Sequence, residues 1–172
     1  MSKISSIYCS RQEECKRPYG AVPSGETVKF CIHPLRSAGV LRAQLLLCAD
    51  GAQPESIDMH WGGYCGARDC YTVSVTAGAP GLFWYYFKIQ TTEGEHFICR
   101  SMGGEGTVRE ELGDQFQMTV FDGNYQVASW FGRGITYNIF PDRFNRTQVP
   151  PADGYRSVRH VHENWSDTPV YL

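Results

Sequence analysis

The sequence predicts an all-β protein built as an antiparallel β-sandwich, and two patterns lead to this fold class. Short segments in which apolar and polar residues alternate recur at intervals of about ten residues, as in the strands of a sandwich. Clusters of residue types that favour turns separate these segments, and the helical period is nearly absent. One packed core is expected, because a chain of 172 residues with 42% hydrophobic residues is large enough to form it.

Six segments carry the strand pattern, and in chain order they are residues 27–32, 41–48, 71–76, 83–90, 96–100 and 116–121. The first and third alternate strictly, which predicts one buried and one solvated face. The second is more continuously apolar and is expected to be a central strand. The fourth and fifth flank residues 91–95 as a hairpin. Within the fourth, Phe83, Tyr85, Phe87 and Ile89 form the face expected to line the core.

Two longer motifs are more specific than the strand pattern. Residues 80–87 read Pro-Gly-Leu-Phe-Trp-Tyr-Tyr-Phe, and residues 135–144 read Ile-Thr-Tyr-Asn-Ile-Phe-Pro-Asp-Arg-Phe. The first resembles a strand of the starch-binding modules that precede amylase barrels. The second resembles the first barrel strand of the α-amylase superfamily, glycoside hydrolase family 13. The residues that match this second motif are Tyr137, Pro141, Asp142, Arg143 and Phe144.

This resemblance implies a domain organisation. It implies an immunoglobulin-like, carbohydrate-binding-module-like β-sandwich in residues 1–126 and a linker in residues 127–134. Residues 135–172 would be the first strand and following loop of a (β/α)8 barrel, which requires roughly 250 residues when complete. The chain is therefore expected to be the front piece of a larger glycosidase, such as a neopullulanase or pullulanase, with its own downstream barrel as a packing partner.

No catalytic residue is expected in this chain. Retaining hydrolysis of an α-glucoside requires two carboxyl groups about 5 to 5.5 Å apart, and the resemblance implies that both lie on later barrel strands. Asp142 belongs to the barrel motif but does not match the family's nucleophile, and we expect it to pair with Arg143 or to anchor a loop. Some family members bind calcium after this motif, but the sequence here, residues 145–147, lacks the usual carboxylates. No cofactor is expected.

A carbohydrate-binding surface is predicted on the outward face of segment 83–90. Trp84, Tyr86 and Lys88 alternate with the core-facing residues, and aromatic rings beside polar groups suit a sugar. Trp61 and Tyr64, read as part of a Gly-rich loop, are expected to add to it. The expected partner is an α-glucan: starch, glycogen, pullulan or maltooligosaccharides. The same face would equally suit packing against the barrel.

Two other functions remain open from the sequence. The chain is also compatible with a stand-alone glycogen- or starch-binding interaction module, and with a purely structural domain that binds no sugar. The apolar segment that begins at Ile135 would be an exposed strand without its barrel neighbours, so self-association through this tail is a further expectation.

Charge and hydropathy exclude several partner classes. The net charge is −2 and no basic face is indicated, which argues against nucleic acid and anionic membrane surfaces. Residues 1–19 lack an apolar run of signal-peptide length, and no segment has the apolar length of a membrane span. A cytoplasmic location is therefore expected.

Seven cysteines cannot all pair with one another, and they are expected to be reduced thiols. Cys65 and Cys70, with His60 nearby, suggest a zinc site, but no second pair completes four ligands at standard spacing. No metal is therefore expected. Cys31 and His33 lie close together in the sequence, but no third residue that would orient them for nucleophilic chemistry can be placed.

Overall fold

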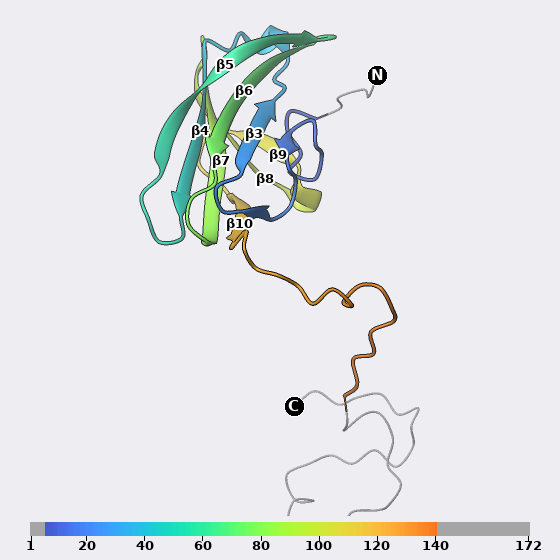
Figure 1. The fold of residues 1–172 in the computed structure, drawn as a ribbon. Coiled ribbons are helices and arrows are strands. Elements are labelled where there is room, and N and C mark those ends of the chain that lie inside the picture. The colour runs from blue at the N-terminus through green and yellow to red at the C-terminus, as the bar shows by residue number, and fades with distance from the viewer. Residues whose placement is uncertain (1–5, 141–172) are drawn as a thin grey trace, which may run out of the picture. The chain divides into compact units, whose positions relative to one another are not determined.

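The computed structural model describes residues 6–140, and the motif residues Pro141, Asp142, Arg143 and Phe144 lie outside the described range (Figure 1). The chain divides into two units, Met1–Gln126 and Val127–Leu172. Within the described residues, no helix has the length and apolar character needed to cross a membrane.

The described part of the first unit is all-β, with ten strands and two short 3₁₀ helices. The strands are β1 (Lys16–Arg17), β2 (Val22–Pro23), β3 (Thr27–Ile32), β4 (Arg42–Ala49), β5 (Glu55–Cys65), β6 (Arg68–Thr76), β7 (Gly81–Thr91), β8 (Gly94–Arg100), β9 (Gly106–Arg109) and β10 (Phe116–Phe121). The helices are η1 (Arg36–Ala38) and η2 (Met102–Gly104). All six strands predicted from alternation are present, within a few residues of the expected bounds.

The strands form one curled sheet whose two parts face each other across the core. One part has the order β1-β3-β6-β5, and the other has the order β5-β4-β7-β10-β2. Strand β5 belongs to both, because its first residues pair with β4 and its last residues pair with β6. The far edge of β7 is shared between β10 and β8, and β9 follows β8. The predicted fold class is confirmed, with β10 and β2 forming the parallel exception.

The prediction that Trp61 and Tyr64 lie in a Gly-rich loop is wrong. Both residues are part of β5, and the ladder with β6 continues on each side of a register shift between them. Gly63 has a φ of +111°, a conformation that favours glycine, so the two glycines form a bulge within the strand instead of ending it.

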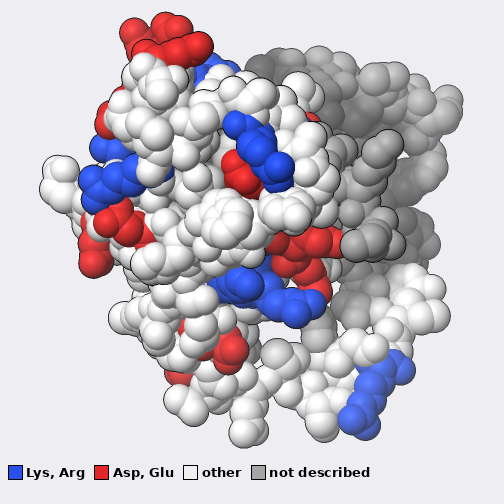
Figure 2. All heavy atoms as spheres, turned by 90° about the horizontal axis from the view of Figure 1, so that it is seen from above, with Lys and Arg blue, Asp and Glu red and all other residues white. Residues whose placement is uncertain are grey.

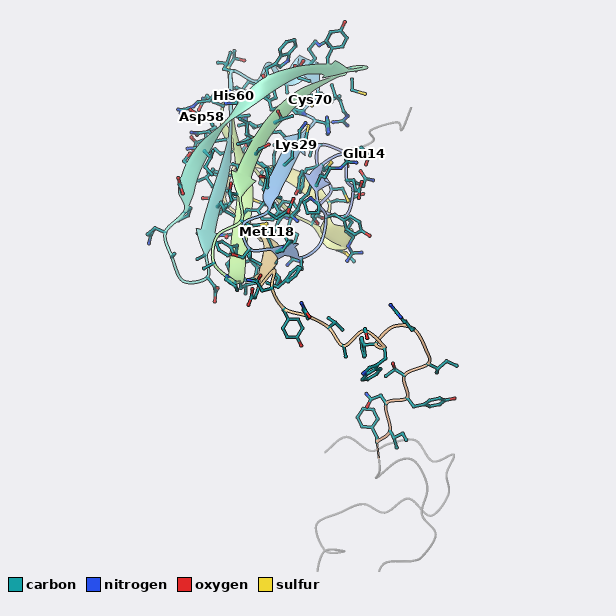
Figure 3. All side chains as sticks on the ribbon, viewed as in Figure 1. Glu14, Lys29, Asp58, His60, Cys70 and Met118 are labelled. Carbon is teal, nitrogen blue, oxygen red and sulfur yellow. The ribbon has the colours of Figure 1, made fainter. Side chains whose placement is uncertain are left out.

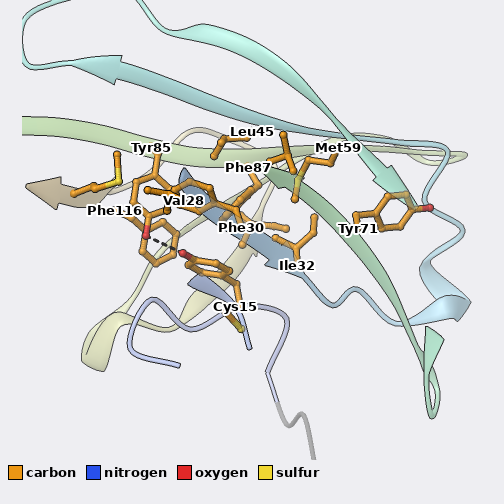
Figure 4. Packing of buried hydrophobic residues seen from close by; sticks show 14 of the residues in the cluster. Cys15, Val28, Phe30, Ile32, Leu45, Met59, Tyr71, Tyr85, Phe87 and Phe116 are labelled. Atoms are coloured by element: carbon orange, nitrogen blue, oxygen red, sulfur yellow. Dashed lines mark hydrogen bonds between the residues drawn. The ribbon is translucent and has the colours of Figure 1, made fainter. Parts of the chain in front are cut away.

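Aromatic rings fill the centre of the core, where Phe30 of β3 meets Tyr85 and Phe87 of β7 (Figure 4). The four residues of segment 83–90 that were predicted to line the core do so. Phe116 of β10 stacks on Tyr85, with the two ring centroids 5.2 Å apart. Burying each such ring contributes about 1.5 to 3 kcal/mol, so this cluster accounts for much of the stabilisation.

The N-terminal segment, residues 6–17, covers the free edge of β3. Main-chain amides of β3 and of the residue that follows it donate hydrogen bonds to this segment. The Cys31 amide donates to the Cys15 carbonyl at 2.8 Å, and the His33 amide donates to the Ile7 carbonyl at 2.7 Å. Tyr8 reaches from this segment into the core and is fully buried. The segment therefore protects an edge strand and completes the core at once.

The described part of the second unit, residues 127–140, forms no strand, and its side chains are exposed. This differs from the barrel strand predicted to begin at Ile135. A barrel strand is held by hydrogen bonds to neighbouring strands, and no described strand pairs with this segment. Tyr137 is 80% exposed there.

Candidate functional site

The residues predicted to bind carbohydrate lie in two different places. Trp84, Tyr86 and Lys88 lie on β7, between β4 and the strands β10 and β8. Trp61 and Tyr64 lie in the part of β5 that pairs with β6, which belongs to the other half of the curled sheet. The structure therefore shows two separate candidate surfaces where the sequence suggested one.

On β7, each of the three predicted side chains already has a partner within the chain. The Trp84 indole Nε1 donates to Asp50 Oδ1 at 2.7 Å. Tyr86 is only 6% exposed, its ring centroid lies 6.1 Å from that of Phe97, and burial raises the pKa of its hydroxyl. Lys88 Nζ forms an ion pair with Glu95 Oε2 at 3.0 Å. Little ring area of Tyr86 is left for a sugar to stack on.

On β5, by contrast, both aromatic side chains are open to solvent. Trp61 is 59% exposed and Tyr64 is 69% exposed. The Trp61 indole Nε1 donates to Asp69 Oδ1 at 3.3 Å, and the Arg36 guanidinium lies 4.6 Å from the Tyr64 ring centroid. Arg36 Nε also lies 3.5 Å from Asp69 Oδ1. These four residues, Trp61, Tyr64, Asp69 and Arg36, are called the Trp61 cluster below.

The bulge in β5 explains why the two rings share a face. Residues three apart in a regular strand point to opposite sides. Here Trp61 is opposite Tyr71 and Tyr64 is opposite Asp69, so three steps along β5 match two steps along β6. Asp69 and Tyr71 are on one face of β6, and the paired residues of β5 are therefore on that face too.

Arg36 reaches the Trp61 cluster because η1 lies against the β5–β6 turn. The Arg36 amide donates to the Ala67 carbonyl at 2.9 Å, and the Asp69 amide donates to the Pro34 carbonyl at 2.9 Å. These main-chain bonds hold the guanidinium over the Tyr64 ring and beside the Asp69 carboxylate. The aromatic rings are therefore presented in a fixed arrangement with one acidic and one basic group, which is the mixture that recognises a polar ligand with apolar faces.

Charges of both signs are interspersed on the face of the molecule seen from above in Figure 1, as Figure 2 shows. Among the described residues drawn there, no patch of a single sign covers the face. The Trp61 cluster itself contains one carboxylate, whereas retaining glycoside hydrolysis requires two.

A second cluster, missed by the sequence reasoning, joins Cys31, His33 and Cys70. Their potential ligand atoms all lie within 4.8 Å of one another, and the two Sγ atoms are 2.9 Å apart. Burial raises the pKa of the Cys31 thiol, and the neighbouring Cys70 adds to this effect. Burial also lowers the pKa of His33, and Arg68 acts in the same direction.

Of the earlier zinc candidates, Cys70 alone belongs to this cluster. His60 lies on β5 beside the β6 strand of Cys70, and both are labelled in Figure 3. His60 and the exposed Cys65 are not part of the described cluster. The sequence could not show the true grouping, because it depends on the register between β3 and β6, in which Cys31 is opposite Thr72.

Comparison with known proteins relates the chain to amylopullulanases. It is 25% identical to the enzymes of Thermoanaerobacterium thermosulfurigenes and Thermoanaerobacterium saccharolyticum over 174 residues, and to that of Thermoanaerobacter thermohydrosulfuricus over 175 residues. Each match takes in 90% of this chain but only 9%, 13% and 11%, respectively, of the relative. The chain thus spans about a tenth of the length of these curated relatives. No protein-family model matches it.

The matches extend beyond the sandwich, because 90% of 172 residues is more than the 126 residues of the first unit. Among solved structures, a cyclomaltodextrinase is similar over 67% of this chain and 19% of its own, with a TM-score of 0.51 and 13% identity. That likeness confirms the fold. The chain is homologous to a segment of the amylopullulanases, in agreement with the resemblance that its sequence indicated.

Proposed function

We propose that this chain is the noncatalytic N-terminal β-sandwich of an α-glucan-hydrolysing enzyme, and that it holds the glucan at the Trp61 cluster. One observation carries the binding proposal: Trp61 and Tyr64 are exposed on one face of a bulged strand, with Asp69 and Arg36 fixed beside them. The homology to amylopullulanases supports an α-glucan as the ligand.

The chemistry of a glucan matches this cluster. The C–H face of a glucose ring stacks on an indole or phenol ring, while its hydroxyls require hydrogen-bond partners. The Asp69 carboxylate accepts from hydroxyls, and the Arg36 guanidinium donates to them. Because the rings are held before binding, little side-chain entropy is lost on association.

The Trp61 cluster is a better candidate than the β7 face for reasons of exposure. Tyr86 is buried and Trp84 is only partly exposed, whereas Trp61 and Tyr64 are both more than half exposed. The β7 face suits a second part of the proposal, packing against the downstream barrel, since domain interfaces favour Trp and Tyr. Seven free cysteines support a cytoplasmic location as a further proposal.

Titration calorimetry of the full chain with maltoheptaose tests the binding proposal. We expect millimolar or tighter binding, and Trp61→Ala or Tyr64→Ala should each weaken it by about 1 to 2 kcal/mol, roughly tenfold. Trp130→Ala is the matched control, because Trp130 is 72% exposed but lies in the second unit. Absence of binding by the wild-type chain at millimolar sugar would leave a purely structural role.

A release assay tests the noncatalytic part separately. Incubation of the pure chain with starch, pullulan or cyclodextrin should release no reducing sugar, because the paired carboxylates that hydrolysis requires are expected on the downstream barrel. Steady release that persists through repeated purification would show that the chain is catalytic by itself.

A further inference from the structure

The cluster of Cys31, His33 and Cys70 lies on the outer face of the sheet, away from the Trp61 cluster. On β3, Val28, Phe30 and Ile32 belong to the core, so Cys31 and His33 alternate to the opposite face. On β6, Tyr71 and Val73 belong to the core, which turns Cys70 to that same outer face. Strand pairing then brings the three side chains together.

Residues on an outer face are normally solvated, but these are not. Cys31 is 5% exposed and His33 is 3% exposed. Cys70 is partly exposed, so solvent reaches the cluster from its side. A buried imidazole on the outer face of a sheet requires a specific interaction that keeps it there.

His33 lacks such an interaction within the chain. Neither Nδ1 nor Nε2 has a hydrogen-bond partner among the described residues. A neutral imidazole carries one N–H donor and one acceptor nitrogen, so at least two polar functions are left unsatisfied, at a cost of about 1 to 3 kcal/mol each. The Sγ atoms of Cys31 and Cys70, 2.9 Å apart, form a hydrogen bond with each other, but neither thiol is a partner of the His33 ring nitrogens.

We propose that Cys31, His33 and Cys70 bind a zinc ion. Two thiolates and one imidazole are ligands that zinc prefers, and their ligand atoms lie within 4.8 Å of one another. Small side-chain rotations would bring them to the spacing of about 3.5 to 3.8 Å that a tetrahedral zinc with these bond lengths requires. Two thiolates also neutralise the charge of the ion. Water on the side of Cys70 supplies the fourth ligand.

The main chain provides the support that a zinc-bound histidine usually has. A ligating imidazole typically donates its second N–H to a carbonyl or carboxylate. The Glu14 carbonyl, in the N-terminal segment, lies near the His33 ring but accepts no hydrogen bond from it. Zinc binding would shorten the distance between the His33 ring and the Glu14 carbonyl to that of a hydrogen bond. The N-terminal segment would then be held more firmly at the edge of β3.

Cobalt substitution gives the first test. The full chain is reduced anaerobically, stripped with a chelator and titrated with Co²⁺ and then Zn²⁺. One Co²⁺ per chain should bind, with thiolate-to-cobalt charge-transfer absorption and the intense visible bands of tetrahedral coordination, and Zn²⁺ should displace it. X-ray absorption of the zinc form should show two sulfur ligands at about 2.3 Å and nitrogen or oxygen ligands at about 2.0 to 2.1 Å.

Variants locate the site. Cys31→Ser, Cys70→Ser and His33→Ala should each lose at least tenfold in cobalt affinity, while circular dichroism reports whether each still folds. Cys65→Ser is the matched control, and His60→Ala tests the grouping that the sequence suggested; both should bind as the wild-type chain does. Failure of the reduced wild-type chain to take up either metal overturns the proposal, as does loss of binding in Cys65→Ser or His60→Ala.

Discussion

The hydroxyl groups of Tyr8 and Tyr85 lie 2.8 Å apart in the core, and both residues are fully buried. Their rings meet edge to face, with centroids 6.3 Å apart and an interplanar angle of 86°. The dashed line in Figure 4 marks this hydrogen bond. Because Tyr8 is in the N-terminal segment, which covers the edge of β3, and Tyr85 is in β7, this bond joins the two parts of the curled sheet across the core, and each hydroxyl depends on the other for its partner.

Tyr8→Phe should therefore cost about 1 to 3 kcal/mol in the free energy of unfolding, because it leaves the Tyr85 hydroxyl buried without a partner. The Tyr8→Phe/Tyr85→Phe double variant should be closer to the wild type than the sum of the single variants, since both polar groups are then removed. Urea denaturation of the four proteins measures this coupling. Strictly additive effects would contradict the pairing.

The same pair predicts a loss of stability in alkali. Burial raises the pKa of both Tyr8 and Tyr85 above the ordinary value of 10.0. The neutral form is therefore favoured in the folded state, and the stability it contributes is complete below about pH 10 and falls as the pH rises above that value. The double Phe variant, which cannot ionise there, should lose stability less steeply than the wild type above pH 10.

Lys16 changes the stability in the opposite direction as the pH rises. Its contribution is the same in the wild type and in the double variant, so it cancels when the two are compared. Burial lowers its pKa to about 8 from an ordinary 10.5, so its contribution to stability grows between these values in both proteins. The difference between wild type and double variant, measured by urea denaturation from pH 8 to 11, isolates the tyrosines. Parallel curves above pH 10 would contradict the prediction.

Gly106 is predicted to be required for the close packing of β9 on the N-terminal segment. An added Cβ there would lie 2.8 Å from Ile98 Cγ2 and 3.0 Å from Tyr8 Cβ. Gly106→Ala should destabilise the fold by about 1 to 3 kcal/mol through overpacking. Gly81→Ala is the control in another strand, where nothing lies within 4 Å of the added atom. Equal melting temperatures for the two variants would show that the packing can adapt.

Trp84 is predicted to be a structural residue. Its indole N–H holds Asp50, and the Asp50 amide donates to the Leu82 carbonyl at 2.8 Å, so the turn after β4 is tied to β7. Trp84→Phe keeps a ring but loses the donor, and should cost about 1 kcal/mol in stability while leaving maltoheptaose binding unchanged. A tenfold loss of sugar affinity without destabilisation would instead restore the β7 face as the binding surface.

The strands that alternate regularly were predictable from sequence, because Val28, Phe30 and Ile32 can be read as one buried face without knowledge of their neighbours. Strand β5 was not, because Gly62 and Gly63 resemble a loop until their pairing with β6 is known. Tyr8 was missed as a core residue since the segment around it has no periodicity and is held by tertiary contacts.

The candidate sites show the same limit. Sequence identified Trp61, Tyr64 and Trp84 as aromatic residues that could bind sugar, but which of them are exposed depends on the bulge and on the partner of each indole. The grouping of Cys31 with Cys70 depends on a strand register that no local pattern specifies. Residue types were therefore predictable, and their association in space was not.

The most direct measurement of the central claim is a nuclear magnetic resonance titration of the full chain with maltoheptaose, following the indole N–H signals of its four tryptophans. Each signal is assigned by a Trp→Phe variant. The Trp61 signal should shift saturably with added sugar, while the signals of Trp84 and Trp130 should stay in place. A saturable shift of Trp84 with none at Trp61, or no shift of any indole at millimolar sugar, would contradict it.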